Sequence, residues 1–302
     1  PESSLRVEAS VDQDGNIVVL DARASYLRLD DLNKFQSLLQ PDQLVSLVEA
    51  APSGTIRNLA ATVSDIDAEM PQFNVTAELE RVGVAAVGER PGVRGVSGLI
   101  RADRSGGRVE IDSQNFTISI PRLLTQRVDV TTATGTVIWR NGDDRTTVLS
   151  DAIAVDSGFF QSQSNVQLIL HKDGSSPEVD LDSQWSISNV AVAKRYIPQR
   201  ILNPRLYEWF QMALVGGSIP AGTTRLRGPL DSFPFDNGEG QFLVRGSVRN
   251  LAFKYHRAWP AAERADIEVV LDGARLYTTE NRSVSAGVPV SNADVDLSLI
   301  HI

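Results

Sequence analysis

Three kinds of side chain in this sequence could support catalysis or metal binding: histidines, a serine among glycines, and pairs of acidic residues. His171, His256 and His301 are far apart, and none has a partner at the spacing of metal ligands. His171 leads into an Asp-Gly turn, so we assign it to an exposed turn, and we assign His256, in KYHRAWP, to packing or capping at a loop edge. The segment GVSG at 95–98 differs from the G-x-S-x-G nucleophile elbow and predicts no serine chemistry.

Acidic residues separated by one position form pairs that could bind a cation or act as an acid and a base. The pairs are Asp65/Asp67, Asp180/Asp182 and Asp294/Asp296. In a strand this spacing places both carboxylates on one face. The residue between them is Ile, Leu or Val, so we expect each pair to mark the solvent face of a half-buried strand.

Asp12, Asp14 and Asn16 resemble the opening of a calcium-binding loop. The position that should close such a loop with an acidic side chain holds Arg23, so an Asp-Gly hairpin turn is the better interpretation. The glycine-rich segments also lack dinucleotide-binding and phosphate-loop spacings. The sequence therefore predicts no enzymatic activity, no cofactor and no metal site.

Composition excludes further classes of function. The net charge of −9, with basic residues scattered singly, disfavours nucleic acid as a partner. The absence of cysteine excludes disulfides, thiolate catalysis and cysteine-ligated metals. No apolar run approaches the roughly 20 residues of a membrane-spanning helix. Both ends of the chain lie within alternating runs, LRVEASV and ADVDLSLIHI, so we expect an internal piece of a longer protein.

Alternation of apolar and polar residues is the dominant pattern and predicts strands with one buried and one wet face. It is clear in LRVEASV, FTISI, SNVQLIL, EVDLDSQWSI and DIEVVL. Asn-Gly and Asp-Gly turns separate these runs, without intervening helices. The fold class is therefore mainly β: a long antiparallel, twisted meander sheet with a few short covering helices.

Two segments predict helices. Residues 29–54 are expected to hold two short helices, the second beginning at Pro41 and ending near 52–54. Residues 203–217 carry Asn203 as N-cap, Pro204 at the first helical position and Gly216 as the stop. We expect one domain over 1–302, with a weak sub-boundary near the Gly- and Pro-rich stretch 87–98.

A one-sided sheet must cover its apolar face with a second sheet, with helices, or by curling around a guest. Helical cover is small here, which leaves a dry sandwich or a groove that holds lipid tails. Exposing an acyl chain of about 16 carbons to water costs on the order of 12 kcal/mol. A groove lined by alternate strand residues would offset most of that cost and needs no catalytic group.

A set of spaced motifs resembles the AsmA-like superfamily, specifically its YhdP-type branch. The matching residues are Trp209, Gly217, Leu226, Gly228, Phe233, Pro234, Phe235, Gly240, Phe242, Tyr255, Trp259 and Pro260. Upstream, P.G.I.NL at 52–59, PGVRGVSG at 91–98 and G.V.W at 135–139 are also similar, so the resemblance covers roughly 40–296. Phe210 departs conservatively from the leucine that usually follows the tryptophan.

The resemblance implies an envelope protein of Gram-negative bacteria, held in the inner membrane by an N-terminal helix outside this chain and extending through the periplasm. Its β-groove would conduct phospholipids between the inner and outer membranes, with other segments of the same long chain as neighbours. The aromatics Phe233, Phe235, Tyr255 and Trp259 would be architectural, holding the covering helix and the strand crossing to the groove wall.

Side chains that share a strand face with other apolar residues are the candidates for lining this β-taco groove. They are Phe116, Ile118, Ile120, Val166, Leu168, Leu170, Phe242, Val244, Val248, Ile267, Val269 and Leu271. Two rival functions stay open. A filled core would favour a scaffolding envelope protein with a dry β core, and carboxylates converging in a polar cleft would favour a carbohydrate-active or hydrolytic enzyme.

Overall fold

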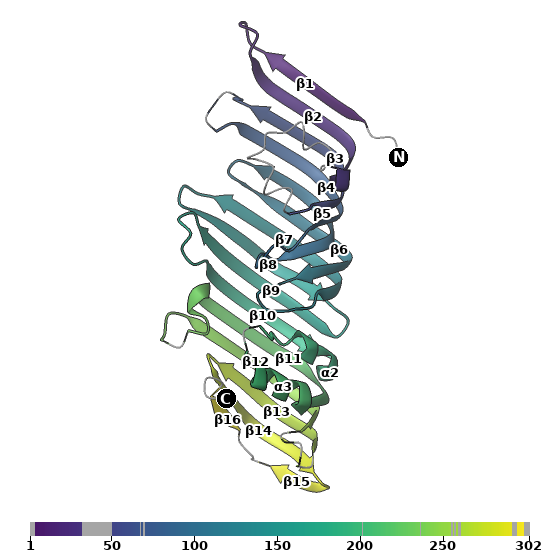
Figure 1. Ribbon diagram of the computed structural model, residues 1–302, viewed down its shortest axis with the longest axis vertical. Coiled ribbons are helices and arrows are strands. Elements are labelled where there is room, and N and C mark those ends of the chain that lie inside the picture. Colours follow the sequence, from purple (N-terminus) through teal and green to yellow (C-terminus); the bar gives the residue numbers. More distant parts are fainter. Residues whose placement is uncertain are drawn as a thin grey trace. The chain divides into compact units, whose positions relative to one another are not determined.

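A computed structural model describes residues 4–31, 50–66, 68, 70–200, 202–235, 237–254, 256, 258, 261–291 and 295–298. Its strands form a 16-stranded antiparallel sheet in which β1 to β15 follow one another in chain order, while β16 pairs with β14 (Figure 1). The sheet is not closed. The predicted mainly β, antiparallel meander is therefore confirmed.

The chain divides into two compact units, Pro1–Pro121 with Gln126–Val148, and Arg122–Thr125 with Leu149–Ile302. The first unit contains β1 (Leu5–Val11), β2 (Ile17–Arg28), β3 (Ser53–Ser64), β4 (Gln72–Val84), β5 (Gly92–Asp103), β6 (Gly106–Ser119), β7 (Val128–Asn141) and the start of β8 (Arg145–Asp156). The second contains the rest of β8, β9 (Phe160–His171), β10 (Glu178–Ile187), β11 (Leu214–Pro229), β12 (Gln241–Phe253), β13 (Ala262–Asp272), β14 (Arg275–Ser285), β15 (Val288–Ser291) and β16 (Asp296–Ser298). The stretch 87–98 lies within the first unit, where it leads into β5.

The turn between β1 and β2 shows what the acidic residues at 12–16 do. The backbone N–H groups of Asp14 and Asn16 both donate to Asp12 Oδ1 at 2.9 Å. Hydrogen bonds from Asn16 hold the pKa of the Asp12 carboxyl below its ordinary value. Gly15 supplies the left-handed φ of 85° that the turn needs. The prediction of a hairpin turn here is confirmed.

Two short α-helices precede β11, α2 (Val190–Ala193) and α3 (Pro204–Ala213). The Asn203 side chain accepts from Arg205 N at 2.9 Å and Pro204 begins the helix, which confirms the predicted start of α3. The predicted stop at Gly216 is wrong, because the chain enters β11 at Leu214, which pairs with Phe253 of β12. Of the stretch 29–54 that was expected to hold two helices, residues 32–49 lie outside the described residues, and the expected helix end near 52–54 is wrong because β3 begins at Ser53.

Left-handed residues interrupt several strands and are stabilised by a repeated hydrogen bond. In β4, β8 and β12 the N–H of such a residue donates to a side-chain oxygen of the following strand. The bonds are Arg81 N to Ser97 Oγ at 3.0 Å, Ala152 N to Asn165 Oδ1 at 2.8 Å, and Asn250 N to Asp266 Oδ1 at 3.0 Å. The ladder register shifts at Arg81 and at Asn250, which marks β-bulges. Bulges bend a strand and increase its twist.

Removing the acceptor at one of these bulges should destabilise the fold. Asp266→Leu leaves the N–H of Asn250 without its acceptor, and we expect it to lower the free energy of unfolding by about 1 kcal/mol. Asp266→Asn keeps an acceptor oxygen and should cost much less. Urea unfolding followed by circular dichroism measures both variants. Equal losses for Leu and Asn would show that this hydrogen bond does not stabilise the bulge.

Candidate functional site

The pairing register of the second unit places apolar side chains of neighbouring strands on one face of the sheet. Directly opposite residues of antiparallel strands share a face. One such row crosses β9 to β12 and consists of Val166, Leu181, Leu226 and Phe242. A second row joins Val244 of β12, Leu271 of β13 and Leu276 of β14. We call this surface the apolar face.

The structure places most of the sequence-predicted candidates on the apolar face of the second unit. They are Val166, Leu168 and Leu170 in β9, Phe242, Val244 and Val248 in β12, and Ile267, Val269 and Leu271 in β13. The remaining three belong to the first unit. Phe116 and Ile118 lie in β6, opposite Val130 and Val128 of β7, and Ile120 follows the end of β6.

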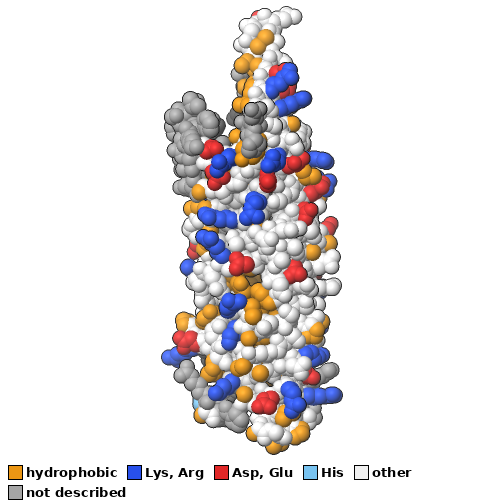
Figure 2. Space-filling model, turned by 90° about the vertical axis from the view of Figure 1, so that its right-hand side faces the viewer, with side chains coloured by type: hydrophobic (Ala, Val, Ile, Leu, Met, Phe, Trp, Pro, Cys, Tyr) orange, Lys and Arg blue, Asp and Glu red, His pale blue; other side chains and the backbone are white. Residues whose placement is uncertain are grey.

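Much of the apolar face is accessible. Val166, Val244 and Val269 are only half-buried, and Leu170 is 38% exposed. The chain exposes 18666 Å², whereas a folded monomer of 32.9 kDa typically exposes about 12,500 Å². Figure 2 shows hydrophobic side chains gathered between charged ones in the lower half of the view. Part of the apolar face of the second unit is therefore exposed to solvent, while Val248 packs with Val190, Leu251 and Ala265 in a buried cluster.

An apolar cavity of about 230 Å³ lies within the second unit, between the helices and the sheet. It is lined by Trp185, Val190, Leu206, Trp209, Phe210, Leu214, Ile219, Val244, Gly246, Val248, Leu251, Phe253, Ile267, Val269, Leu276, Thr278 and Val295. The structure thus brings the candidates Val244, Val248, Ile267 and Val269 together around one apolar cavity.

Aromatic contacts hold α3 over this cavity. The ring of Trp209 packs edge-on against Phe253 of β12, with centroids 5.7 Å apart, and against Phe210 at 5.2 Å. Leu206 is 2% exposed, so it is the deepest apolar contact of the helix's first turns. Packing of Leu206, Trp209 and Phe210 on one side of α3 explains why this ten-residue helix is stable at this position.

Lys194 fixes the end of α3 to the segment that follows α2. Its Nζ donates to the carbonyl oxygens of Gln211 and Leu214 at 2.8 and 2.9 Å, and Gln211 Nε2 donates back to the Lys194 carbonyl at 2.8 Å. An ammonium group at a helix C-terminus satisfies unpaired carbonyls and complements the helix dipole. This cation is a structural lock that the sequence did not reveal.

A tryptophan lying on a glycine occurs in both units. In the second unit, a Cβ on Gly222 would lie 2.6 Å from three ring atoms of Trp185, whose Nε1 donates to Thr224 Oγ1 at 2.9 Å. In the first unit, a Cβ on Gly107 would lie 2.4 Å from Cζ2 of Trp139. In each case the glycine leaves room for the indole ring of the residue opposite it in the neighbouring strand.

The aromatic motif at 233–235 stabilises the connection between β11 and β12. Phe235 is 6% exposed and packs on Gly228 and Gly240, where an added Cβ would come within 3.0 and 2.7 Å of its ring. Phe233 lies 4.9 Å from the ring of Phe242. These aromatics lie at the end of β11 opposite to α3, so they hold this connection and not the covering helix, which corrects our expectation. Tyr255, Trp259 and Pro260 lie outside the described residues.

Acidic and histidine side chains do not assemble a reactive site in the part of the chain that the structure describes. No group of three or more His, Asp or Glu residues there could hold a metal ion. Asp296 pairs with Arg275 at 2.6 Å, while Asp67, Asp294 and His301 lie outside the described residues. His171 ends β9 and is half-buried, with Nε2 3.4 Å from Glu178 Oε1, so its expected exposed position is wrong.

Asp180 and Asp182 lie on the face of β10 opposite to the apolar one, as expected for a solvent face. Arg227 Nε lies 2.9 Å from Asp180 and Arg225 Nε 2.7 Å from Asp182, across the β10–β11 ladder. The hydrogen bond from Arg225 lowers the pKa of the Asp182 carboxyl below its ordinary value. These acids are therefore partners of arginines across the ladder.

This pair gives a pH dependence with a defined sign. Because the pKa of Asp182 is lowered by folding, its contribution to stability is present above the unfolded value of about 3.9 and is lost as the pH falls through the folded value. We expect Arg225→Gln to reduce stability slightly at about pH 6 and to make no difference at about pH 2. Urea midpoints of both proteins at the two pH values measure this. If the urea midpoints of the two proteins differed equally at both pH values, the ion pair would be excluded as the cause of the difference.

The register defines a β-sheet protein with an extended apolar face, part of which is exposed. The family model of the YhdP protein matches residues 1–301, and the chain belongs to this family. It is 23% identical over 276 residues to the intermembrane phospholipid transporter YhdP of Escherichia coli strain K12, over 90% of this chain. The match covers 22% of that relative's length. No solved structure matches the chain. Among the described residues, no helix is long and apolar enough to span a membrane.

Proposed function

We propose that this chain is a periplasmic segment of a bridge-like phospholipid-transfer protein of a Gram-negative bacterium. Lipid tails lie against its apolar face on their way between the inner and outer membranes. The relative in Escherichia coli is an intermembrane phospholipid transporter. The observation that supports the proposal is the apolar face, which is partly exposed in β9, β12 and β13 and lines an apolar cavity between the helices and the sheet.

The energetics of lipid transfer match such a surface. Moving a CH₂ group into water costs about 0.8 kcal/mol, so an acyl chain of about 16 carbons cannot cross water unaided. Contact with Val166, Val244 and Val269 offsets this cost because these side chains are half-buried in the free protein. Lipid that covers them would complete their burial. Transfer by this route makes and breaks no covalent bond, so the proposed protein is not an enzyme.

Backbone geometry supports curling of the sheet into a groove. Bulges at Arg81 and Asn250 bend their strands, and repeated bulges give a sheet curvature. In an open curved sheet, the acyl tails of a phospholipid would contact the apolar face while its head group stays in water. Other segments of the longer chain, including an N-terminal helix in the inner membrane, would supply the contacts with both membranes, since this chain matches 22% of its relative.

Native mass spectrometry of the chain purified from a bacterial periplasm, with lipid extraction of the same sample, tests the proposal. We expect co-purified phospholipid and uptake of labelled phospholipid from vesicles. A clean apo mass together with no uptake would contradict lipid transfer. That outcome would favour a scaffolding envelope protein whose apolar face is covered by protein.

A further inference from the structure

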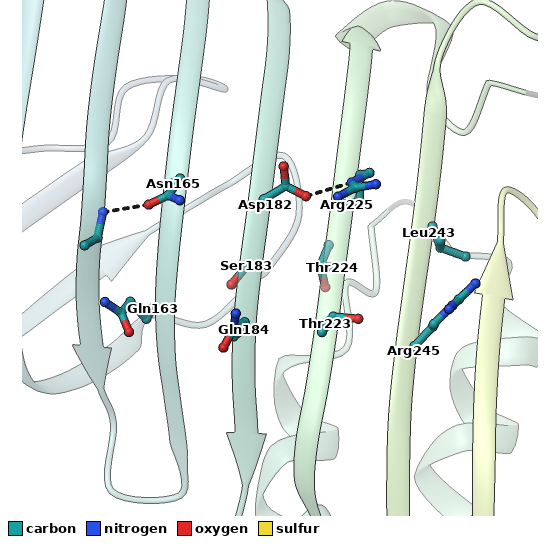
Figure 3. A pocket seen from close by; sticks show the side chains of 11 residues that line it. Gln163, Asn165, Asp182, Ser183, Gln184, Thr223, Thr224, Arg225, Leu243 and Arg245 are labelled. Atoms are coloured by element: carbon teal, nitrogen blue, oxygen red, sulfur yellow. Dashed lines mark hydrogen bonds and ion pairs between the residues drawn. The ribbon is translucent and has the colours of Figure 1, made fainter.

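A hollow of about 650 Å³ lies on the polar side of the second unit, across β8 to β12 (Figure 3). Four of its side chains form a line across neighbouring strands. They are Gln163, Gln184, Thr223 and Arg245, and we call them the polar row. Gln163 is directly opposite Gln184, Gln184 opposite Thr223, and Thr223 opposite Arg245.

Register fixes the dimensions of the polar row. Adjacent strands are about 4.8 Å apart, so the row spans about 14 Å. Its members are held by central strands of the sheet, and Figure 3 shows them side by side along the hollow. An extended ligand that contacts all four residues must therefore run across the strands.

The polar row differs from the next row of the same hollow, where Asp182 and Arg225 satisfy each other at 2.7 Å. No hydrogen bond or ion pair within the described part of the chain uses a side chain of the polar row. Arg245 is therefore a cation without a counter-ion among the described residues, beside two amides and a hydroxyl. Four other arginines of the unit are paired with acids: Arg225, Arg227, Arg249 and Arg275.

The polar row and the apolar face are on opposite sides of the sheet. Gly246 lines the apolar cavity, whereas Arg245, its neighbour in β12, lines the hollow. Successive side chains of a strand point to opposite faces. A lipid whose tails lie on the apolar face therefore cannot place its head group on the polar row, and any ligand of the row is separate from that lipid.

We propose that the polar row binds an acidic saccharide, with its carboxylate at Arg245 and its hydroxyl groups along Thr223, Gln184 and Gln163. A guanidinium binds carboxylates through two parallel hydrogen bonds. Amides and hydroxyls both donate and accept, as sugar hydroxyls do. A row of about 14 Å is too long for a simple anion. A peptide strand would instead pair with a free sheet edge, and a nucleic acid needs several clustered cations, whereas the polar row holds one.

Isothermal titration calorimetry at low ionic strength tests this on the 302-residue chain. The probes are a tetrasaccharide with one terminal hexuronic acid, the neutral tetrasaccharide of the same linkage, and inorganic phosphate. We expect the acidic probe to bind at least about tenfold more tightly than the neutral one. Arg245→Gln should remove that difference, while Gln184→Ala should weaken both saccharides about fivefold.

Arg101→Gln is the matched control, because Arg101 is an exposed strand arginine outside the hollow. It should leave all affinities unchanged. Equal affinity for the two saccharides, no effect of Arg245→Gln, or phosphate binding as tightly as the acidic saccharide would each overturn the proposal. Lipid uptake should be unaffected by Arg245→Gln, so this result is independent of the proposed lipid transfer.

Discussion

Replacing Val269 with aspartate is expected to reduce bound phospholipid at least about tenfold. Val269 lines the apolar cavity, opposite Gly246 of β12 and Thr278 of β14. A carboxylate at this position either stays hydrated, which excludes an acyl chain, or is buried at a cost of several kcal/mol. Native mass spectrometry and uptake of labelled phospholipid from vesicles both measure the loss.

Val270→Asp is the control for this variant. Val270 is the next residue of the same strand and is opposite Arg245 and Tyr277, so its side chain points to the polar side. Val270 is the same residue type as Val269 and is also half-buried. We expect Val270→Asp to retain lipid. Val269→Thr, which keeps the shape of valine, should lose less lipid than Val269→Asp while folding like the native chain. Equal lipid content in the two aspartate variants would contradict binding at the apolar face.

The second large effect concerns the glycine beneath Trp185. We expect Gly222→Val to lower the free energy of unfolding by about 2–3 kcal/mol, because the added atoms overlap the indole ring. The three atoms nearest to a Cβ added at Gly222 all belong to the Trp185 ring, so the ring is the main obstacle to a side chain there. In a Trp185→Leu background the same substitution should cost less than about 0.5 kcal/mol.

A double-mutant cycle from urea unfolding measures this coupling, which we expect to exceed about 1.5 kcal/mol. Gly238→Val is a comparison at a glycine where an added Cβ would have no neighbour within 4 Å and where backbone strain from its φ of 86° acts instead. It should not couple to Trp185. Additive effects of Gly222→Val and Trp185→Leu would show that close packing against the ring does not select glycine at 222.

Local sequence patterns predicted the faces of the sheet correctly. Alternation placed Val244 and Val269 on one side because the side-chain period of a strand is two, and the register confirms that they share a face. The start of α3 was also predictable, since Asn203 and Pro204 act on the backbone within one turn. Whether the shared face contacts lipid depends on the whole sheet. The alternation within single strands does not predict it.

Other features depend on residues that are far apart in the sequence. Gly222 is needed because Trp185 is opposite it in β10, and Gly240 because the ring of Phe235 lies on it. The end of α3 was placed too late since ladder pairing of Leu214 with Phe253 takes precedence over a glycine stop. The polar row was also not predicted, because glutamine and threonine carry no motif until the register aligns them.

Pairing of each strand with its neighbour in the sequence has a consequence for how such a chain can fold. From β1 to β15, each strand pairs with the strand before it and the strand after it in the sequence. Most connections are short, and even at the longer ones before β3 and β11 the entropy of loop closure grows only slowly with length. A chain that emerges end-first from a translocation channel can add one strand after another to an existing sheet edge. Its length can then grow in evolution by added hairpins without slowing any single step of assembly.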